Sequence, residues 1–185
     1  MENNFTFIAS KALDDPEVTK GTLLWHLFSG EKTPIASISH RSIYGGDYCS
    51  ATVEYNGGSL SCSAWCDHIT GKGALPFTDS SGNTVAVLRH KYTLATNERW
   101  TMEYDGDIYP ITVTQDSVSH KKTILVYDPV PEQKGEVLCF YPLAYIEYAQ
   151  ISSDYSGLVT QRLPMELCMA IVWLPFVIGI ARTSK

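Results

Sequence analysis

The sequence is poor in charged residues. Only 18% of its 185 residues are Asp, Glu, Lys or Arg, whereas an average soluble domain has about 25%. The 14 Lys and Arg stand against 20 Asp and Glu, which gives a formal net charge of −6. This balance makes a broad basic surface for nucleic acid unexpected. At 44% hydrophobic residues, the chain is also too apolar for a disordered protein.

Cysteine is scarce, and no leader segment is evident. Five cysteines are an odd number in a chain of this length, which favours free thiols over a disulfide scaffold. Residues Met1 to Ile8 contain no positive region and no long apolar run, so a secretory signal is not expected. We therefore predict a cytoplasmic protein; a mature secreted protein that has lost its signal is the alternative.

Catalytic and cofactor motifs are absent as well. The sequence has no nucleophile elbow, no phosphate-binding glycine loop, no dinucleotide fingerprint and no zinc-protease helix. Cys62 and Cys66 precede Asp67 and His68, but on an extended strand these two cysteines lie about 13 Å apart. Two thiolates on one zinc ion must lie much closer, so only a tight turn in this segment would allow a site. We predict no metal and no cofactor, and we assign no catalytic residue.

What the chain does have is a long series of short segments with strand character. They are rich in Val, Ile, Thr, Tyr and Trp, and turn residues such as Asn56-Gly57-Gly58 and Asp105-Gly106 separate them. Residues 99–104 alternate regularly, with Trp100, Met102 and Tyr104 on one face, which is typical of an antiparallel strand with one buried side. The predicted strands are Thr22–Phe28, Pro34–His40, Tyr48–Tyr55, Leu60–Trp65, Thr84–Arg89, Arg99–Tyr104, Ile108–Thr114, Thr123–Tyr127, Glu136–Tyr141 and Ala144–Tyr148.

The C-terminal segment Leu167–Ala181 holds 15 residues without a charge. Pro164 and Glu166 favour the start of a helix just before it, and Pro175 should kink or end the regular helix. As a membrane anchor the segment would span about 22 Å, short of the roughly 30 Å hydrocarbon core. As an amphipathic surface helix it lacks a polar face. We therefore favour a helix buried inside a strand barrel, with no transmembrane span.

These features together predict one domain over residues 1–185. Its class is all-β: a closed antiparallel barrel of about 10–12 strands over residues 22–160, wrapped around an apolar helix over residues 163–181. Because the helix would fill the barrel, a deep central pocket is not expected. Binding would then use the outer surface or the loops.

Three segments carry a resemblance to a known family. Residues Arg99–Tyr109 pair an aromatic strand with a Tyr strand through Asp105-Gly106, Leu138–Tyr148 follow as further strands, and Met165–Ile180 form the apolar helix. The chain resembles the tubby C-terminal-like superfamily, in which a closed barrel wraps a central hydrophobic helix. Within it, the chain is similar to an uncharacterised family of small fungal domains related to the LURP-one proteins of plants.

The resemblance implies a binding module, because some members of the superfamily bind phosphoinositides. Two clusters of basic residues are the candidate binding sites for lipid head groups or phosphate, since both could place cations beside a phosphate. They are Arg89 with Lys91, and His120 with Lys121 and Lys122. We expect a non-enzymatic intracellular module that recognises phospholipid head groups or a protein partner. The alternatives are an enzyme with a loop-built His or Cys site, using residues such as His68, and a lectin-like or defence interaction protein.

Overall fold

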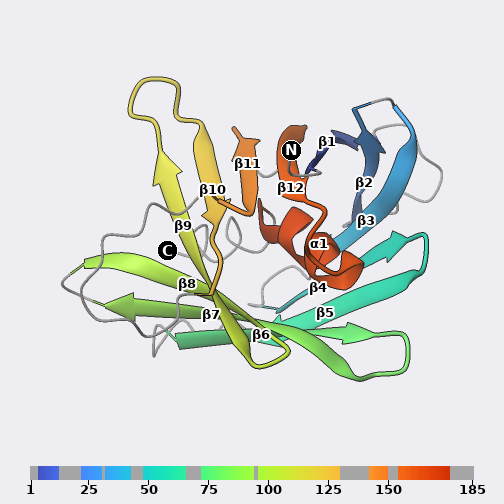
Figure 1. The fold of residues 1–185 in the computed structure, drawn as a ribbon, viewed down its shortest axis with the longest axis horizontal. Helices are drawn as coiled ribbons and strands as arrows, with labels where there is room; N and C mark the ends of the chain where they lie inside the picture. Colours follow the sequence, from blue (N-terminus) through green and yellow to red (C-terminus); the bar gives the residue numbers. More distant parts are fainter. Residues whose placement is uncertain are drawn as a thin grey trace.

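The computed structural model describes residues 4–12, 22–30, 32–42, 48–65, 72–93, 96–129, 142–149 and 154–175. In this part of the chain, twelve antiparallel strands close into a barrel, and β1 pairs with both β2 and β12 (Figure 1). The predicted all-β barrel with a C-terminal helix is thereby confirmed. The elements are β1 (Asn4–Lys11), β2 (Thr22–Ser29), β3 (Pro34–Ser42), β4 (Tyr48–Tyr55), β5 (Gly58–Trp65), β6 (Lys72–Asp79), β7 (Thr84–Thr93), β8 (Thr96–Tyr104), β9 (Asp107–Gln115), β10 (Lys122–Val126), β11 (Ala144–Tyr148), β12 (Tyr155–Thr160) and α1 (Met165–Val172).

The hairpin turns follow the predicted residues. β4 and β5 are joined at Asn56-Gly57, and β8 and β9 at Asp105-Gly106. Gly106 has a φ of +85°, a backbone conformation that residues with a side chain rarely adopt. β4 and β11 have the predicted bounds. The predicted strand Glu136–Tyr141 lies outside the described residues.

Three strands were not predicted: β1, β6 and β12. The barrel therefore begins at Asn4 and not at residue 22 as expected. β6 contains Gly73 and Pro76, which normally argue against a strand. The proline is tolerated because β6 is a full ladder partner of β7 only; its pairing with β5 is limited to Leu60 with Asp79 and Ser61 with Thr78.

Among the described strands, the ladder between β5 and β6 therefore has the fewest paired residues. Where it ends, the hydroxyl oxygens of Ser61 and Thr78 lie 3.0 Å apart. The Thr78 hydroxyl also lies 3.2 Å from the backbone oxygen of Ser61, to which it donates. These side chains join the two strands at the point where backbone pairing stops.

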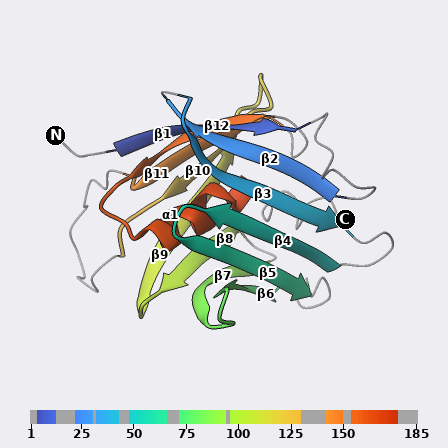
Figure 2. The same ribbon diagram turned by 90° about the vertical axis from the view of Figure 1, so that its right-hand side faces the viewer.

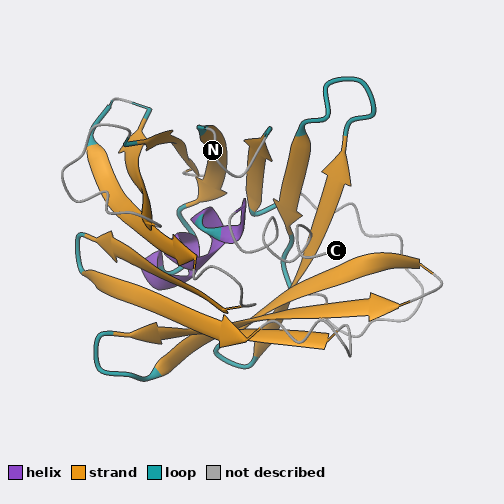
Figure 3. Ribbon diagram, turned by 180° about the vertical axis from the view of Figure 1, so that it is seen from behind, coloured by secondary structure: helices purple, strands orange, loops and turns teal. Residues whose placement is uncertain are grey.

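Helix α1 lies inside the barrel, as Figures 2 and 3 show, and it is buried from Leu167 onward. Residues 167–174 are at most 2% exposed. Inward residues of the strands, such as Leu27, Ile38 and Leu88, belong to the same hydrophobic core. A helix that is apolar all round requires this environment, and burial of its side chains supplies much of the driving force for folding.

The described part of the predicted helix 163–181 is helical from Met165 to Val172 and again at Leu174 and Pro175, with a turn at Trp173 between them. Pro175 accounts for this, because a proline removes the hydrogen bond to the carbonyl four residues before it, here that of Ile171, and clashes with that group. The backbone N–H of Trp173 donates to the Ile171 carbonyl instead. Tyr155, buried on β12, donates its hydroxyl hydrogen to the Val172 carbonyl over 3.0 Å. Residues after 175 lie outside the described part.

No helix among the described residues has the length and apolar character needed to cross a membrane.

Candidate functional site

Arg89 is the first of the predicted binding residues, and it lies in the middle of β7. The strand continues to Thr93, beyond the predicted end at Arg89. Arg89 is outward-facing, and its Nε donates to Glu103 Oε1 on β8 over 2.5 Å. This bond raises the pKa of Arg89 and lowers the pKa of Glu103. The charge of Arg89 is thus already opposed by a carboxylate.

Lys91 lies two residues further along β7, in a row of three cationic positions. It pairs directly with Lys72 on β6 and with Arg99 on β8. We call these three positions the cationic row. Because side chains alternate along a strand, position 91 shares the face of Arg89. The strand register therefore brings three residues of cationic type to directly opposite positions on β6, β7 and β8.

Lys72 and Arg99 were not among the predicted site residues. Their link to Lys91 depends on the register of β6 and β8, and β6 was not predicted at all. The sequence signal that could have found them is the run Arg89-His90-Lys91 followed by the hairpin that returns through Arg99. Pairing the two strands of that hairpin residue by residue would have placed Lys91 opposite Arg99.

The second predicted cluster follows the turn between β9 and β10. The Asp116 carboxylate organises this turn, because Oδ1 accepts from the backbone N–H of Val118 and of Ser119 over 3.0 and 2.6 Å. These bonds lower the pKa of Asp116. His120 has a φ of +57°, and its backbone N–H donates to the Asp116 carbonyl. The turn thereby fixes where the chain enters β10 at Lys122.

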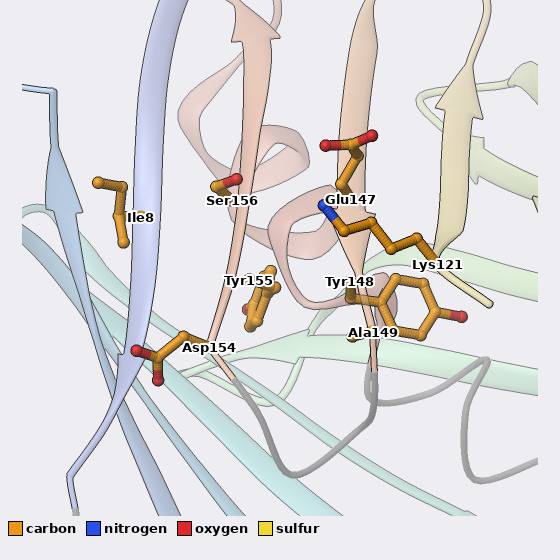
Figure 4. A pocket seen from close by; sticks show the side chains of 8 residues that line it. All are labelled: Ile8, Lys121, Glu147, Tyr148, Ala149, Asp154, Tyr155 and Ser156. Atoms are coloured by element: carbon orange, nitrogen blue, oxygen red, sulfur yellow. The ribbon is translucent and has the colours of Figure 1, made fainter. Parts of the chain in front are cut away.

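Lys121 and Lys122 point in different directions. Lys122 shares the inward side of β10 with buried Ile124 and Val126, and its Nζ lies 5.7 Å from the ring centre of Tyr148. This geometry is a cation–π contact. Lys121 is exposed and lines a hollow on the outside of the barrel (Figure 4). The two lysines therefore do not form one phosphate site.

The hollow that Lys121 lines has a volume of about 320 Å³. We call it the outer pocket. Its charged groups are Lys121, Glu147 and Asp154, and β1, β11, β12 and the β9–β10 turn contribute to its walls (Figure 4). Its lining residues are Ile8, Lys121, Glu147, Tyr148, Ala149, Asp154, Tyr155 and Ser156.

The two predicted clusters lie on different parts of the barrel. β8 and β9 separate β7, with Arg89 and Lys91, from β10, with Lys122. They are offset along the strands as well. The backbone N–H of Tyr127, the residue after β10, donates to the Pro110 carbonyl. Pro110 pairs with Thr101, and Thr101 pairs with Arg89. Lys122 is five residues, or roughly 16 Å of strand, from Tyr127. They are two separate surfaces.

A second hollow, of about 290 Å³, lies over the β7–β9 sheet near the Asp105-Gly106 turn. Val85, Val87 and Ile108 line it, and Ile108 is 53% exposed. Its carboxylates are Glu103, which binds Arg89, and Asp105. The described residues that line it include no His, Cys or Ser that could serve as a nucleophile or base.

The cysteine and histidine candidates form no catalytic or metal cluster in the described part. Cys62 is buried on β5, and His90 stacks on Trp100 with ring centres 4.1 Å apart. Cys66 and His68 lie outside the described residues. Among the residues that are described, no group of three His, Cys, Asp or Glu side chains is placed to hold a metal ion.

Comparisons with known proteins add no identification. No family model matches the chain, and neither a curated protein nor a solved structure does. The resemblance to the tubby C-terminal-like superfamily therefore stays a prediction.

Proposed function

We propose that this barrel is a binding module, tubby-like in type, that recognises phosphate-bearing lipid head groups through the cationic row. The observation that carries the proposal is the direct pairing of Lys72 with Lys91 and of Lys91 with Arg99. The interior is filled by α1, which leaves the outer surface as the place for a ligand.

The electrostatics of the row support an anionic ligand. The three paired positions of the row are all Lys or Arg, so a phosphate bound across them would meet three opposite charges. Arginine offers a planar pair of donors that matches two phosphate oxygens, while lysine acts as a point charge. Arg99 would then orient the phosphate, with Lys72 and Lys91 adding charge. The neighbouring Arg89 is less available, because it binds Glu103.

The expected strength is moderate. Each Lys or Arg near an anionic membrane surface contributes about 1 kcal/mol. Three such residues contribute about 3 kcal/mol, so removing them should lower the partition coefficient about a hundredfold. A binding free energy of this size depends strongly on salt, because exposed charges are screened over about 8 Å at physiological ionic strength.

Vesicle flotation tests the proposal. Wild-type protein should float with phosphatidylcholine vesicles that contain phosphatidylinositol 4-phosphate and should stay below with phosphatidylcholine alone. The triple variant Lys72→Gln, Lys91→Gln, Arg99→Gln should lose this binding. Lys32→Gln, an exposed lysine in the β2–β3 turn, removes the same kind of charge at another place and should float normally.

Two results would overturn the proposal. One is wild-type protein that does not float with either vesicle; the other is a folded triple variant that floats as well as the wild type. Equal loss of binding in Lys32→Gln would show a nonspecific charge effect instead of a site. Binding to an acidic protein without binding to vesicles would show that the ligand is a protein partner and not a lipid.

A further inference from the structure

The outer pocket carries an arrangement of charges that the proposed lipid binding does not use. Its described lining residues carry one ammonium group, on Lys121, and two carboxylates, on Glu147 and Asp154. A ligand that complements it has one anionic and two cationic groups. We propose that the outer pocket binds a free basic α-amino acid of the lysine type. This inference does not depend on the proposed lipid binding, because it rests on a different surface.

Strand register builds the floor of the pocket. Ile8 on β1 pairs with Ser156 on β12, and Ser156 pairs with Glu147 on β11. These three side chains therefore form one row on the outer face of the barrel (Figure 4). Asp154 lies two residues before Ser156, and diagonal neighbours of this kind are about 7–8 Å apart between their Cα atoms. The two carboxylates thus stand on separate sides of the pocket.

Both carboxylates are held in place by hydrogen bonds outside the pocket. Asp154 Oδ1 accepts from the backbone N–H of Lys11 over 2.8 Å. Glu147 Oε1 accepts from the hydroxyl of Tyr145 over 2.6 Å. Each carboxylate has a second oxygen for a ligand ammonium, which has three N–H donors. Fixing the acceptors in advance lowers the entropy cost of binding.

Lys121 supplies the group that receives the ligand carboxylate. Its backbone N–H is 3.3 Å from Ser119 Oγ in the turn that Asp116 organises, so its position on the rim is defined. Within the described residues, no carboxylate oxygen lies within 4 Å of its ammonium group. Figure 4 shows this group on the Glu147 side of the pocket, with Asp154 on the other side of Tyr155.

This placement orients the ligand. The α-carboxylate and α-ammonium are adjacent in an amino acid, so they match Lys121 and Glu147. The side-chain ammonium then extends to Asp154. The methylene stem between them lies against Ile8, which is 48% exposed. A volume of about 320 Å³ is at the lower end for small-molecule sites, which run from about 300 to 1,000 Å³.

Three ligands that differ by one group test the inference by shift titration of backbone amide resonances. Lysine has all three charged groups, norleucine lacks the side-chain ammonium, and cadaverine lacks the carboxylate. We expect lysine to saturate the shifts of Ile8 and Ser156, and each analogue to bind at least about fivefold more weakly, since each loses one charged hydrogen bond.

Protein variants then assign each group to its partner. Lys121→Gln should weaken lysine about fivefold and leave cadaverine unchanged, because cadaverine has no carboxylate to lose. Asp154→Asn should weaken lysine by a similar factor and leave norleucine unchanged. Lys32→Gln and Asp107→Asn make the same chemical changes at exposed positions outside the pocket and should bind lysine as the wild type does.

The inference is wrong if lysine gives no saturable shifts at the pocket. It is also wrong if norleucine or cadaverine binds as tightly as lysine, or if either pocket variant binds lysine as tightly as the wild type. None of these results would bear on the cationic row, because no vesicle is present. In the same way, a negative result in vesicle flotation would not affect the conclusion drawn from the lysine titration.

Discussion

Cys168 is a buried ionisable residue whose environment changes its chemistry. Its side chain is packed in the core on α1, with Sγ 3.6 Å from the Leu163 carbonyl oxygen and 3.8 Å from that of Thr160. Burial, together with the nearby charge of Glu166, raises the pKa of the thiol from 9.0 to about 12. The thiol is therefore expected to be an inert core group and not a nucleophile.

The raised pKa predicts how Cys168 affects stability at alkaline pH. Below pH 9 both folded and unfolded chains keep the proton, and the residue adds no pH dependence. Between pH 9 and about 12 the unfolded chain loses the proton while the folded chain retains it. The free energy of unfolding should then fall by up to about 1.4 kcal/mol per pH unit from this residue alone.

Urea unfolding of the wild type and of Cys168→Ala measures this contribution. The difference in unfolding free energy between the two should be constant at neutral pH and should shift in favour of the variant above pH 9. Because both proteins contain the same other ionisable groups, the comparison cancels their contribution to the pH dependence of the unfolding free energy. Tyr155 is one such group, since burial also raises its pKa. A difference that stays constant through the alkaline range would show that Cys168 is not buried as described.

Single residues of the site were only partly predictable. Arg89 and Lys91 were found as cations, but the sequence did not show that Glu103 would take up Arg89, because that contact needs the β7–β8 register. The need for a glycine at position 157 was likewise not visible in the sequence. A Cβ there would lie 2.6 Å from the Tyr145 carbonyl oxygen and 2.8 Å from the Phe7 ring, contacts between strands far apart in sequence.

At the scale of single elements, α1 makes the sharpest prediction. Ile171 is fully buried, whereas Met165 at the first helical position is 47% exposed. Ile171→Asp would bury an unpaired carboxylate in the barrel, a cost of several kcal/mol out of the roughly 5–15 kcal/mol that stabilise a domain. Met165→Asp introduces the same side chain where solvent reaches it and where the helix N-terminus favours negative charge.

Thermal unfolding of both variants separates the two environments. Ile171→Asp should unfold at a much lower temperature or fail to fold, and Met165→Asp should melt close to the wild type. Similar melting temperatures for the two variants would mean that the helix is not enclosed on the face of Ile171.

Elements with regular alternation were the ones the sequence predicted best. β4 and β8 show the two-residue period because one face packs on the core and the other meets water. β6 and β12 were missed because Pro76 and Gly157 weaken the local strand signal, and their place in the sheet depends on partners elsewhere. The apolar helix was predicted from composition, and its interruption after Val172 agrees with the kink or end expected from Pro175.

At the scale of the whole molecule, barrel closure was expected from strand number and the apolar helix, but not the strands that achieve it. β1 pairs with β12, so Asn4 lies opposite Thr160. No local pattern encodes a contact between positions so far apart. Closure also leaves no free sheet edge at β1, which protects the barrel from edge-to-edge aggregation.

Both proposed ligand surfaces are products of this global arrangement. The cationic row joins three strands, and the outer pocket joins the two ends of the barrel sheet through β1 and β12. The residue types were visible in the sequence, but their neighbours were not. Function on such a barrel therefore depends on register more than on any continuous motif.

The central claim is that the cationic row binds the phosphate of a lipid head group. The most direct measurement is a series of amide correlation spectra recorded while a soluble inositol phosphate is added. The account predicts saturable shifts that are largest around Lys72, Lys91 and Arg99 and that shrink as salt is raised. Shifts absent from these three strands, or concentrated instead at the turns 56–57, 80–83 and 105–106, would contradict it.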